Sequence, residues 1–276
     1  MPDSTPRTGY RPSATIRASL ALHVGAAAAV CMRPQAWPWA LGAVVADHLL
    51  LTGAGLWPRS SLLGPNWTHL PPAFAPHACI ALTIDDGPDP EVTPRVLDLL
   101  DEGGGARATF FCIGERVLQH PALAREIVRR GHAVENHSQR HLHRFALLGP
   151  SAMAAEITRA QQAIRDTTGE APRFFRAPAG LRNPFLEALL VRAQLRLTSW
   201  TRRGFDTRNG NADSVLGRLT RDLASGDILL LHDGHAARTA AGAPVILTVL
   251  PRLLASVAAA GLRSVTLRAT LPPAAP

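Results

Sequence analysis

Short apolar runs alternate regularly with helical patterns from residue 77 onward, and this alternation limits the fold more than any other feature of the sequence. Strands separated by helices predict a parallel sheet with right-handed crossovers. Roughly seven such units favour a closed or nearly closed β/α barrel over a small open sheet. The predicted strands are residues 79–84, 108–112, 133–135, 173–176, 195–200, 227–231 and 263–267. The predicted helices are residues 93–102, 122–130, 151–168, 184–193, 213–224 and 245–260.

Charged and polar side chains follow the predicted strands at their carboxyl ends, where a β/α barrel carries its chemistry. A random scatter of buried polar residues would not place acids and histidines after one strand and then the next. In chain order, these side chains are Asp85 and Asp86 after the first strand, His137 and His141 after the third, Arg176 at the end of the fourth, Asp206 beyond the fifth and His232 after the sixth.

Asp85 and Asp86 directly follow a buried, β-branched run. Two adjacent carboxylates in this position are costly unless a metal ion or an arginine lies in front of them. His137 and His141 are four residues apart, so on a helical turn they would share one face and could bind one metal ion. Two imidazoles and one carboxylate leave an open coordination position, as in catalytic metal sites. The spacing does not tell which aspartate is the ligand and which is a base.

His232 ends an apolar run, where it suits a general acid that protonates a leaving group. A structural histidine that caps the strand explains this motif alone equally well. The sequence lacks the G-x-S-x-G motif of serine hydrolases and the G-x-x-x-x-G-K motif of nucleotide-binding proteins. The Asp-Asp pair would also suit a two-metal phosphoesterase, but the strand ends offer too few carboxylates to bind a second ion.

The amino-terminal region contains two apolar stretches, residues 18–32 and 36–57, which predict a helical hairpin in the membrane. A polar, proline-containing tail of residues 1–17, expected to be disordered, precedes them. A pair of apolar helices packed on the catalytic domain, or a cleaved signal peptide, fits less well. Tryptophans flank the stretches, as expected for indoles at a bilayer interface. These tryptophans are Trp37, Trp39, Trp57 and Trp67.

Asp47 lies near the middle of the second stretch, where a carboxylate costs about 2.5–3.5 kcal/mol on insertion. We therefore expect it to pair with His23 or His48 inside the hairpin.

The positive-inside rule puts both ends of the hairpin in the cytoplasm, but this prediction of orientation rests on few charged residues. The side of the bacterial-type cell membrane on which the catalytic domain lies therefore stays open. The charges are Arg7, Arg11, Arg17 and Arg59 outside the stretches and Arg33 between them.

The net charge of +8 comes entirely from arginine. These arginines are scattered along the chain, and no zinc-finger, helix-turn-helix or RNA-recognition signature accompanies them. We therefore expect a solvated basic surface and no nucleic-acid partner. The sequence indicates no protein partner.

Four motifs resemble those of the polysaccharide deacetylases, the NodB-like carbohydrate esterases, and they follow the family order over residues 77–270. The run TIDDG at 83–87 resembles the T-F-D-D-G motif, and HSQRH at 137–141 resembles H-S/T-x-x-H. RAPAG at 176–180 resembles R-x-P-x-G, and LLHD at 230–233 resembles the final L-x-H motif.

The resemblance implies a distorted (β/α)7 barrel that removes N-acetyl groups from amino sugars. It also implies a divalent metal ion, usually zinc and with cobalt possible, bound by Asp86, His137 and His141. Asp85 would then be the base that activates the metal-bound water.

The resemblance implies further roles around this centre. Arg176 would orient Asp85 and tune its pKa, and His232 would protonate the departing amine. The backbone N–H of Ala179 would stabilise the oxyanion. Ala179 stands where the family often has an aromatic residue, and the D-x-x-D-W motif is reduced to Trp200 followed by residues 204–207, in which Asp206 is the candidate for holding Arg176.

The sequence thus predicts a tail (1–17), a transmembrane hairpin (18–57), a linker (58–76), a catalytic domain (77–270) and a Pro/Ala tail (271–276). The predicted function is membrane-anchored, metal-dependent removal of N-acetyl groups from an amino sugar in a surface polysaccharide or a lipid-linked glycan. The expected partners are the N-acetylated glycan and membrane lipid. An O-acetyl esterase with the same metal site and an inactive glycan-binding membrane protein are the alternatives, and intact Asp85 and His232 argue against the second.

Overall fold

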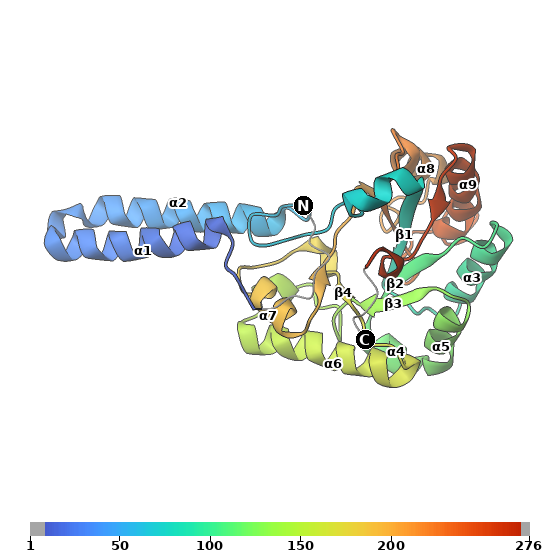
Figure 1. Ribbon diagram of the computed structural model, residues 1–276, viewed down its shortest axis with the longest axis horizontal. Coiled ribbons are helices and arrows are strands. Elements are labelled where there is room, and N and C mark those ends of the chain that lie inside the picture. Colours follow the sequence, from blue (N-terminus) through green and yellow to red (C-terminus); the bar gives the residue numbers. More distant parts are fainter. Residues whose placement is uncertain (1–8, 272–276) are drawn as a thin grey trace.

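The alternation of strands and helices is present in the structure, a computed structural model that describes residues 9–271. The strands pair in parallel in the order β5-β4-β3-β2-β1-β7-β6, and β8 pairs with the start of β1. This curled parallel sheet, covered by helices, confirms the predicted distorted (β/α)7 barrel (Figure 1). The strands are β1 (Cys79–Asp85), β2 (Ala108–Cys112), β3 (Ala133–Asn136), β4 (Phe174–Phe175), β5 (Arg196–Leu197), β6 (Arg202–Arg203), β7 (Ile228–His232) and β8 (Arg263–Ser264).

Seven α-helices surround the described part of the sheet, with short 3-10 turns between some of them. The helices are α3 (Thr93–Glu102), α4 (Gly114–Gln119), α5 (Pro121–Arg129), α6 (Pro150–Thr168), α7 (Leu186–Arg192), α8 (Ala212–Thr220) and α9 (Val245–Ala259). The 3-10 turns are η2 (Pro72–His77), η3 (Phe145–Leu147), η4 (Pro178–Gly180) and η5 (Arg268–Thr270).

Two elements were not predicted, and three predicted strands are shorter than expected. Helix α4 has only six residues, too few to show a helical period, and β6 consists of two arginines rather than apolar residues. The predicted strand at 195–200 is reduced to β5 because the chain then pairs with Trp67 instead of continuing in the sheet. Trp67 donates its N–H to Leu197 O, and Ser199 donates its N–H to Trp67 O.

Strand β1 is buried along its whole length, and its side chains alternate between two cores. Ile80, Leu82 and Ile84 belong to the core that joins the sheet to the surrounding helices. Cys79 and Ala81 belong to a second core inside the barrel. Continuing this alternation places residues 83 and 85 on the interior side, so an acidic residue at 85 must find its partners inside the barrel.

The segment predicted as a linker is instead part of the barrel. Trp67 and Leu70 are each only 3% exposed, and the Trp67 ring meets Phe174 edge-on at 5.2 Å. Leu70 donates its N–H to Gly226 O, so the segment pairs with the chain after β5 on one side and with the chain just before β7 on the other. Trp67 therefore does not mark a bilayer interface, unlike the exposed Trp37, Trp39 and Trp57.

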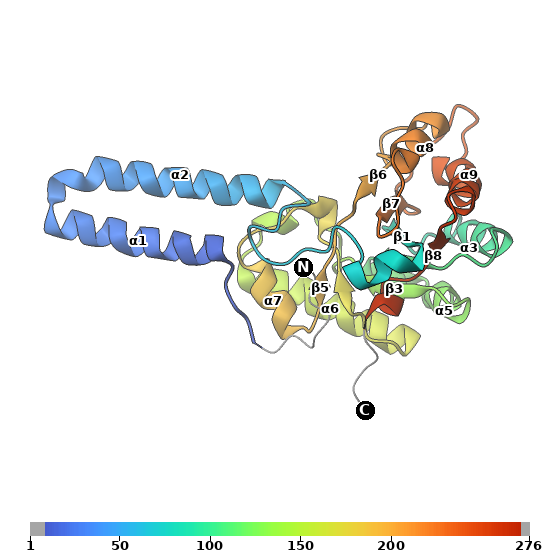
Figure 2. The same ribbon diagram turned by 45° about the horizontal axis from the view of Figure 1, so that its top comes forward.

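Two long helices, α1 (Ala14–Met32) and α2 (Trp37–Leu56), form a hairpin that projects from the barrel (Figures 1 and 2). A 3-10 turn, η1 (Pro34–Ala36), joins them at the far tip. Helix α1 begins inside the predicted tail because Ser13 accepts a hydrogen bond from the N–H of Ile16. Residues 1–8 of that tail, and 272–276 of the predicted carboxyl-terminal tail, lie outside the described residues.

Both helices are long and apolar enough to cross a membrane, a criterion that a signal sequence near the amino terminus also meets. Only 6% and 11% of the residues in their most apolar windows are buried. A core helix of similar hydropathy would be covered by protein, so these two helices need another apolar environment.

The polar residues within the hairpin contact one another. Ser19 donates its hydroxyl to Asp47 Oδ2 at 2.6 Å, a bond that was not predicted. His23 Nδ1 lies 3.9 Å from the same oxygen, and His23 Nε2 lies 3.2 Å from His48 Nε2. The expected partner His23 is therefore present, but the short hydrogen bond to Asp47 comes from serine.

The base of the hairpin is fixed to the barrel through Arg182. Arg182 donates its backbone N–H to Gly55 O at 3.1 Å, and its guanidinium donates to Ser60 O. A methyl group on Gly55 would lie 2.3 Å from Arg182 O, so only glycine fits this contact. Ser13 at the start of α1 donates to Leu62 O at 2.7 Å.

Replacing Trp67 by alanine tests whether this segment is part of the core. We expect Trp67→Ala to lower the free energy of unfolding by about 3–5 kcal/mol, the usual effect of removing a buried tryptophan. Denaturation of the detergent-solubilised protein, followed by circular dichroism, measures the change. The exposed Trp57 provides the matched control, Trp57→Ala, and equal stability of the two variants would contradict the assignment.

Candidate active site

Strand β1 ends at Asp85, and a buried arginine meets this carboxylate inside the barrel. Arg176, which directly follows β4, donates from Nη1 to Asp85 Oδ1 at 2.6 Å and to Thr83 Oγ1 at 2.8 Å. Its Nη2 donates to Ser199 O at 2.7 Å, and its guanidinium lies 4.1 Å above the Phe111 ring. Arg176 is 1% exposed and Asp85 is 3% exposed. The pairing predicted for these two residues is present, and it leaves Asp85 Oδ2 free of the arginine.

Asp86 turns away from its neighbour because its backbone is left-handed, with φ of 76°. Its Oδ1 lies 3.3 Å from Nε2 of both His137 and His141. The ligand atoms of these three residues all lie within 4.8 Å of one another, as required to hold one metal ion. Asp86 Oδ1 is buried and has no hydrogen-bond partner among the described residues. An anionic oxygen in this situation needs a cation, so the residues present fit a metal site.

His137 is oriented by the backbone next to the buried arginine. Its Nδ1 lies 2.8 Å from Arg176 O, and because a carbonyl only accepts, Nδ1 must carry the proton. This leaves the lone pair on Nε2, the atom that faces Asp86, which is the usual arrangement for a metal-binding histidine.

The two histidines are brought together by a loop and not by the helical turn that would place residues four apart on one face. Ser138 and His141 have left-handed φ angles of 63° and 50°, and the His141 N–H donates to Ser138 Oγ at 3.1 Å. Arg140 between them donates from its backbone and its guanidinium to Glu156 of α6, which is 2% exposed. A loop held by this ion pair, rather than a helix, brings both rings to Asp86.

His235 is a site residue that the sequence analysis missed. Its Nδ1 lies 3.0 Å from Asp86 Oδ2 and donates to it, because a carboxylate only accepts. The side chain is 54% exposed on the cleft side of the loop after β7. It follows His232 by three residues, and this second histidine after a strand end was the signal available in the sequence.

Asp206 holds His232, so the prediction that it holds Arg176 is wrong. Asp206 Oδ2 accepts the backbone N–H of His232 at 2.7 Å, and Asp206 Oδ1 lies 2.9 Å from His232 Nδ1. Arg176 is not available to Asp206, because its guanidinium already bonds to Asp85, Thr83 and Ser199. With Nδ1 occupied, His232 presents Nε2 to the cleft.

The acid and base candidates are neighbours across two adjacent strands. Asp85 of β1 is in register with His232 of β7. Ala179 lies in the turn after β4 with a left-handed φ of 54°, and no hydrogen bond of its N–H is found among the described residues. A cleft of roughly 850 Å³ contains Asp85, Asp86, both metal-site histidines, Ala179, His232 and His235.

The charges of the site match a cation between Asp86 and the histidines. Burial raises the pKa of Asp86, but the adjacent His137 ring and the hydrogen bond from His235 outweigh burial and hold the pKa well below the usual range. Burial lowers the pKa of His141 to about 4, so its ring is neutral at pH 7. For His232, burial lowers the pKa, but the contact with Asp206 outweighs burial and raises the pKa above its ordinary value.

The sequence is similar to those of known deacetylases. The family model described as Polysaccharide deacetylase matches residues 75–198. A peptidoglycan-N-acetylglucosamine deacetylase of Bacillus cereus is 36% identical over 176 residues, which cover 63% of this chain and 81% of that protein. A chitooligosaccharide deacetylase of a Bradyrhizobium species is 36% identical over 157 residues, 56% of this chain and 71% of that protein.

Solved structures resemble the barrel in the same way. A family 4 carbohydrate esterase from Streptomyces lividans, in complex with acetate, has a TM-score of 0.61 and 34% identity and covers 68% of this chain and 91% of its own. A family 4 pseudoenzyme from Bacillus anthracis shares the fold with a TM-score of 0.66 at 22% identity, over 75% of this chain and 69% of its own. The chain therefore belongs to the polysaccharide deacetylase family.

Proposed function

We propose that this chain is a membrane-anchored, metal-dependent hydrolase that removes N-acetyl groups from the amino sugars of a glycan. The observation that carries the proposal is Asp86 Oδ1, a buried carboxylate oxygen without a hydrogen-bond partner between two imidazole nitrogens. Asp86, His137 and His141 would hold the ion, and a set with two imidazoles favours zinc or cobalt. The names of the bacterial relatives support an N-acetylated sugar as the substrate.

Each group in the cleft has a place in such a hydrolysis. A divalent cation supplies polarisation of the acetyl carbonyl and acidification of a water molecule. Asp85 accepts the proton of the attacking water on Oδ2, because Arg176 occupies Oδ1. The Ala179 N–H donates to the oxygen that becomes negative in the tetrahedral intermediate. His232 gives a proton from Nε2 to the amine nitrogen as the C–N bond breaks, and acetate and a free amine leave.

An O-acetyl esterase would use the same residues, except that an alcohol would need less help from His232 than an amine. The raised pKa of His232 favours the amide, because a poor leaving group requires a protonated acid at neutral pH. An inactive glycan-binding protein is disfavoured because the residues proposed for catalysis are present in two hydrogen-bonded pairs. Arg176 bonds to Asp85, and Asp206 bonds to His232.

Acetate release from N-acetylglucosamine oligomers tests the proposal directly. We expect the purified full-length protein to lose turnover in a chelator and to regain it with zinc or cobalt. Acetylated xylan should release less acetate per unit time than the oligomers. Asp85→Asn should lower kcat by about 10²–10⁴-fold while the bound metal is retained. Full activity in excess chelator, or an unchanged kcat in Asp85→Asn, would contradict the mechanism.

Asp206 should control the pH range of activity through His232. Because His232 acts as an acid, kcat falls as the pH rises through its pKa, and Asp206 raises that pKa. Asp206→Asn removes the negative charge, so we expect the alkaline limb of the kcat profile to move to lower pH and kcat at neutral pH to fall about tenfold or more. Asp166→Asn, an exposed acid on α6, is the control. Coincident pH profiles for Asp206→Asn and wild type would refute this role.

His235 should act through the orientation of Asp86. We expect His235→Ala to weaken metal binding by about 10–100-fold, as when the partner of a ligand is removed. Competition with a chromogenic chelator measures the affinity, and the exposed His77 gives the control variant His77→Ala. A wild-type affinity in His235→Ala would show that the 3.0 Å contact with Asp86 does not help to hold the metal.

A further inference from the structure

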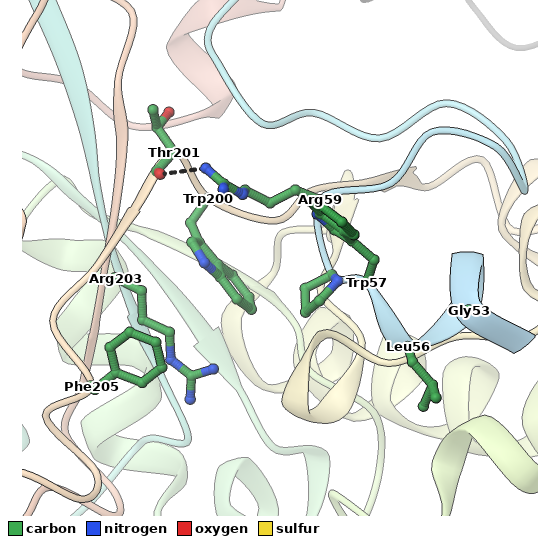
Figure 3. Close-up of a pocket in the computed structure, with 9 residues that line it drawn as sticks. Gly53, Leu56, Trp57, Arg59, Trp200, Thr201, Arg203 and Phe205 are labelled. Atoms are coloured by element: carbon green, nitrogen blue, oxygen red, sulfur yellow. Dashed lines mark hydrogen bonds between the residues drawn. The ribbon is translucent and has the colours of Figure 1, made fainter.

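A second pocket lies where the hairpin joins the barrel, beside the catalytic cleft. Its volume is roughly 630 Å³, and Figure 3 shows its two walls. Residues at the end of α2 form one wall, and the segment between β5 and the loop after β6 forms the other. Trp200 and Arg203 line both this pocket and the cleft that holds Asp85 and His232. The lining residues are Gly53, Leu56, Trp57, Pro58, Arg59, Trp200, Thr201, Arg203 and Phe205.

The pocket carries positive charge without a counterion. None of the residues that line it is acidic. Arg59 donates from Nη1 to Thr201 O at 3.2 Å, the contact drawn in Figure 3. The side chain of Arg203 makes no hydrogen bond or ion pair with any residue of the described chain, and its Nε is buried. A planar guanidinium with free N–H groups is well suited to bind a phosphate.

The remaining walls are apolar and aromatic. The Arg203 guanidinium lies 5.2 Å from the Trp200 ring centroid and 5.0 Å from that of Phe205. Leu56 and Trp57 are 59% and 62% exposed, and Phe205 is 45% exposed. These exposed apolar groups line the same pocket as the two arginines, so the pocket matches a ligand with an anionic group next to a hydrocarbon chain.

The position of the pocket indicates where that hydrocarbon would come from. Helix α2 has 20 residues, which span about 30 Å, the thickness of a bilayer core. Trp57 follows its last residue, at the level where indoles lie between hydrocarbon and headgroups. If the hairpin crosses the membrane, the pocket opens at the headgroup level with its apolar wall continuing along α2.

The hairpin also touches the oxyanion turn. A methyl group on Gly180 would lie 2.7 Å from Pro58 Cβ and 2.7 Å from the Trp200 ring, so these two residues press against the turn that contains Ala179. The segment that follows α2 therefore packs against the turn that lines the site where the acetyl group would be cleaved.

We propose that this pocket binds the phosphate and the first carbons of a lipid that carries the N-acetylated amino sugar, with the sugar in the catalytic cleft. The substrate class is thus a phosphate-linked glycolipid of the membrane rather than a free polymer. This inference rests on the deacetylase function and the membrane anchor proposed above. Arg59 and Arg203 bind the phosphate, and Leu56, Trp57 and Phe205 contact the hydrocarbon.

Three N-acetylglucosamine substrates test the inference with the full-length protein in phosphatidylcholine nanodiscs. They are the dodecyl phosphodiester of the sugar, the dodecyl glycoside without phosphate, and a soluble oligomer. We expect kcat/KM for acetate release to be at least about tenfold higher for the phosphodiester than for the glycoside, the effect of one charge-assisted hydrogen bond or more. Because the two lipid substrates share the chain and the sugar, this ratio isolates the phosphate.

Arg59→Gln and Arg203→Gln should each lower the phosphodiester-to-glycoside ratio by about tenfold. Arg165→Gln changes an exposed arginine on α6 and should leave the ratio at the wild-type value. Arg59→Lys, which keeps the charge but not the planar fork, should recover part of the ratio. Circular dichroism and the melting temperature of each variant report whether it is folded.

The possible outcomes separate this inference from the function on which it rests. Equal kcat/KM for the two lipid substrates, or a ratio that neither arginine variant changes, overturns the phosphate site while leaving the deacetylase intact. A preference of tenfold or more for the soluble oligomer identifies a polymer as the substrate and also overturns the inference. Failure to release acetate from all three substrates contradicts the proposed deacetylase itself, and the pocket assignment with it.

Discussion

The buried guanidinium of Arg176 is the group whose hydrogen bonds connect the separate segments of the barrel interior. It is 1% exposed and joins three parts of the chain, because it donates to Thr83 and Asp85 of β1 and to Ser199 beyond β5, while its own residue follows β4. A buried charge is tolerated only when an opposite charge and further acceptors surround it, and removal of one partner of such a pair typically costs about 3–5 kcal/mol. The same backbone also sets the metal site, because Arg176 O fixes the proton of His137 on Nδ1. One residue thereby orients the base and one ligand of the proposed centre.

Around this arginine, the site is built from backbone that ordinary side chains rarely adopt. Asp86, Ser138, His141 and Ala179 all have left-handed φ angles, at roughly 1–2 kcal/mol each for a residue with a Cβ. The surrounding hydrogen bonds hold them there. Ser138 accepts from His141, and Glu156 binds Arg140. The strained backbone therefore lowers the folding stability of the barrel, and in return it places two histidines, one carboxylate and one free N–H in the same part of the cleft.

The barrel and most of the site could be predicted from the sequence, but each was recognised from a different kind of signal. The strands were recognisable because runs such as β1 and β7 are apolar and fully buried, and the ligand candidates because each follows such a run. Three features could not be predicted from the sequence because they depend on contacts between distant segments. Trp67 joins the core through Thr198 and Phe174, Asp206 meets His232 across 26 positions, and His235 reaches Asp86 across 149. The helical turn expected at 137–141 failed because side-chain contacts, not local periodicity, set that backbone.

The hairpin and the barrel are joined by direct contacts in this structure. Arg182 joins the end of α2 to the segment at residue 60, and Pro58 packs where Gly180 leaves no room for a side chain. A fragment that began at residue 60 would keep the metal ligands, the base and the acid, but it would lose Pro58 and Arg59 from the pocket beside the cleft. If the hairpin is the membrane anchor proposed above, it would do more than raise the local concentration of enzyme at a membrane, because the residues that follow it line the pocket beside the cleft. Under the anchoring proposed above, a substrate from the bilayer would reach the pocket lined by Trp57 and Arg59 next to the cleft that contains Asp85, and this arrangement favours a lipid-linked sugar.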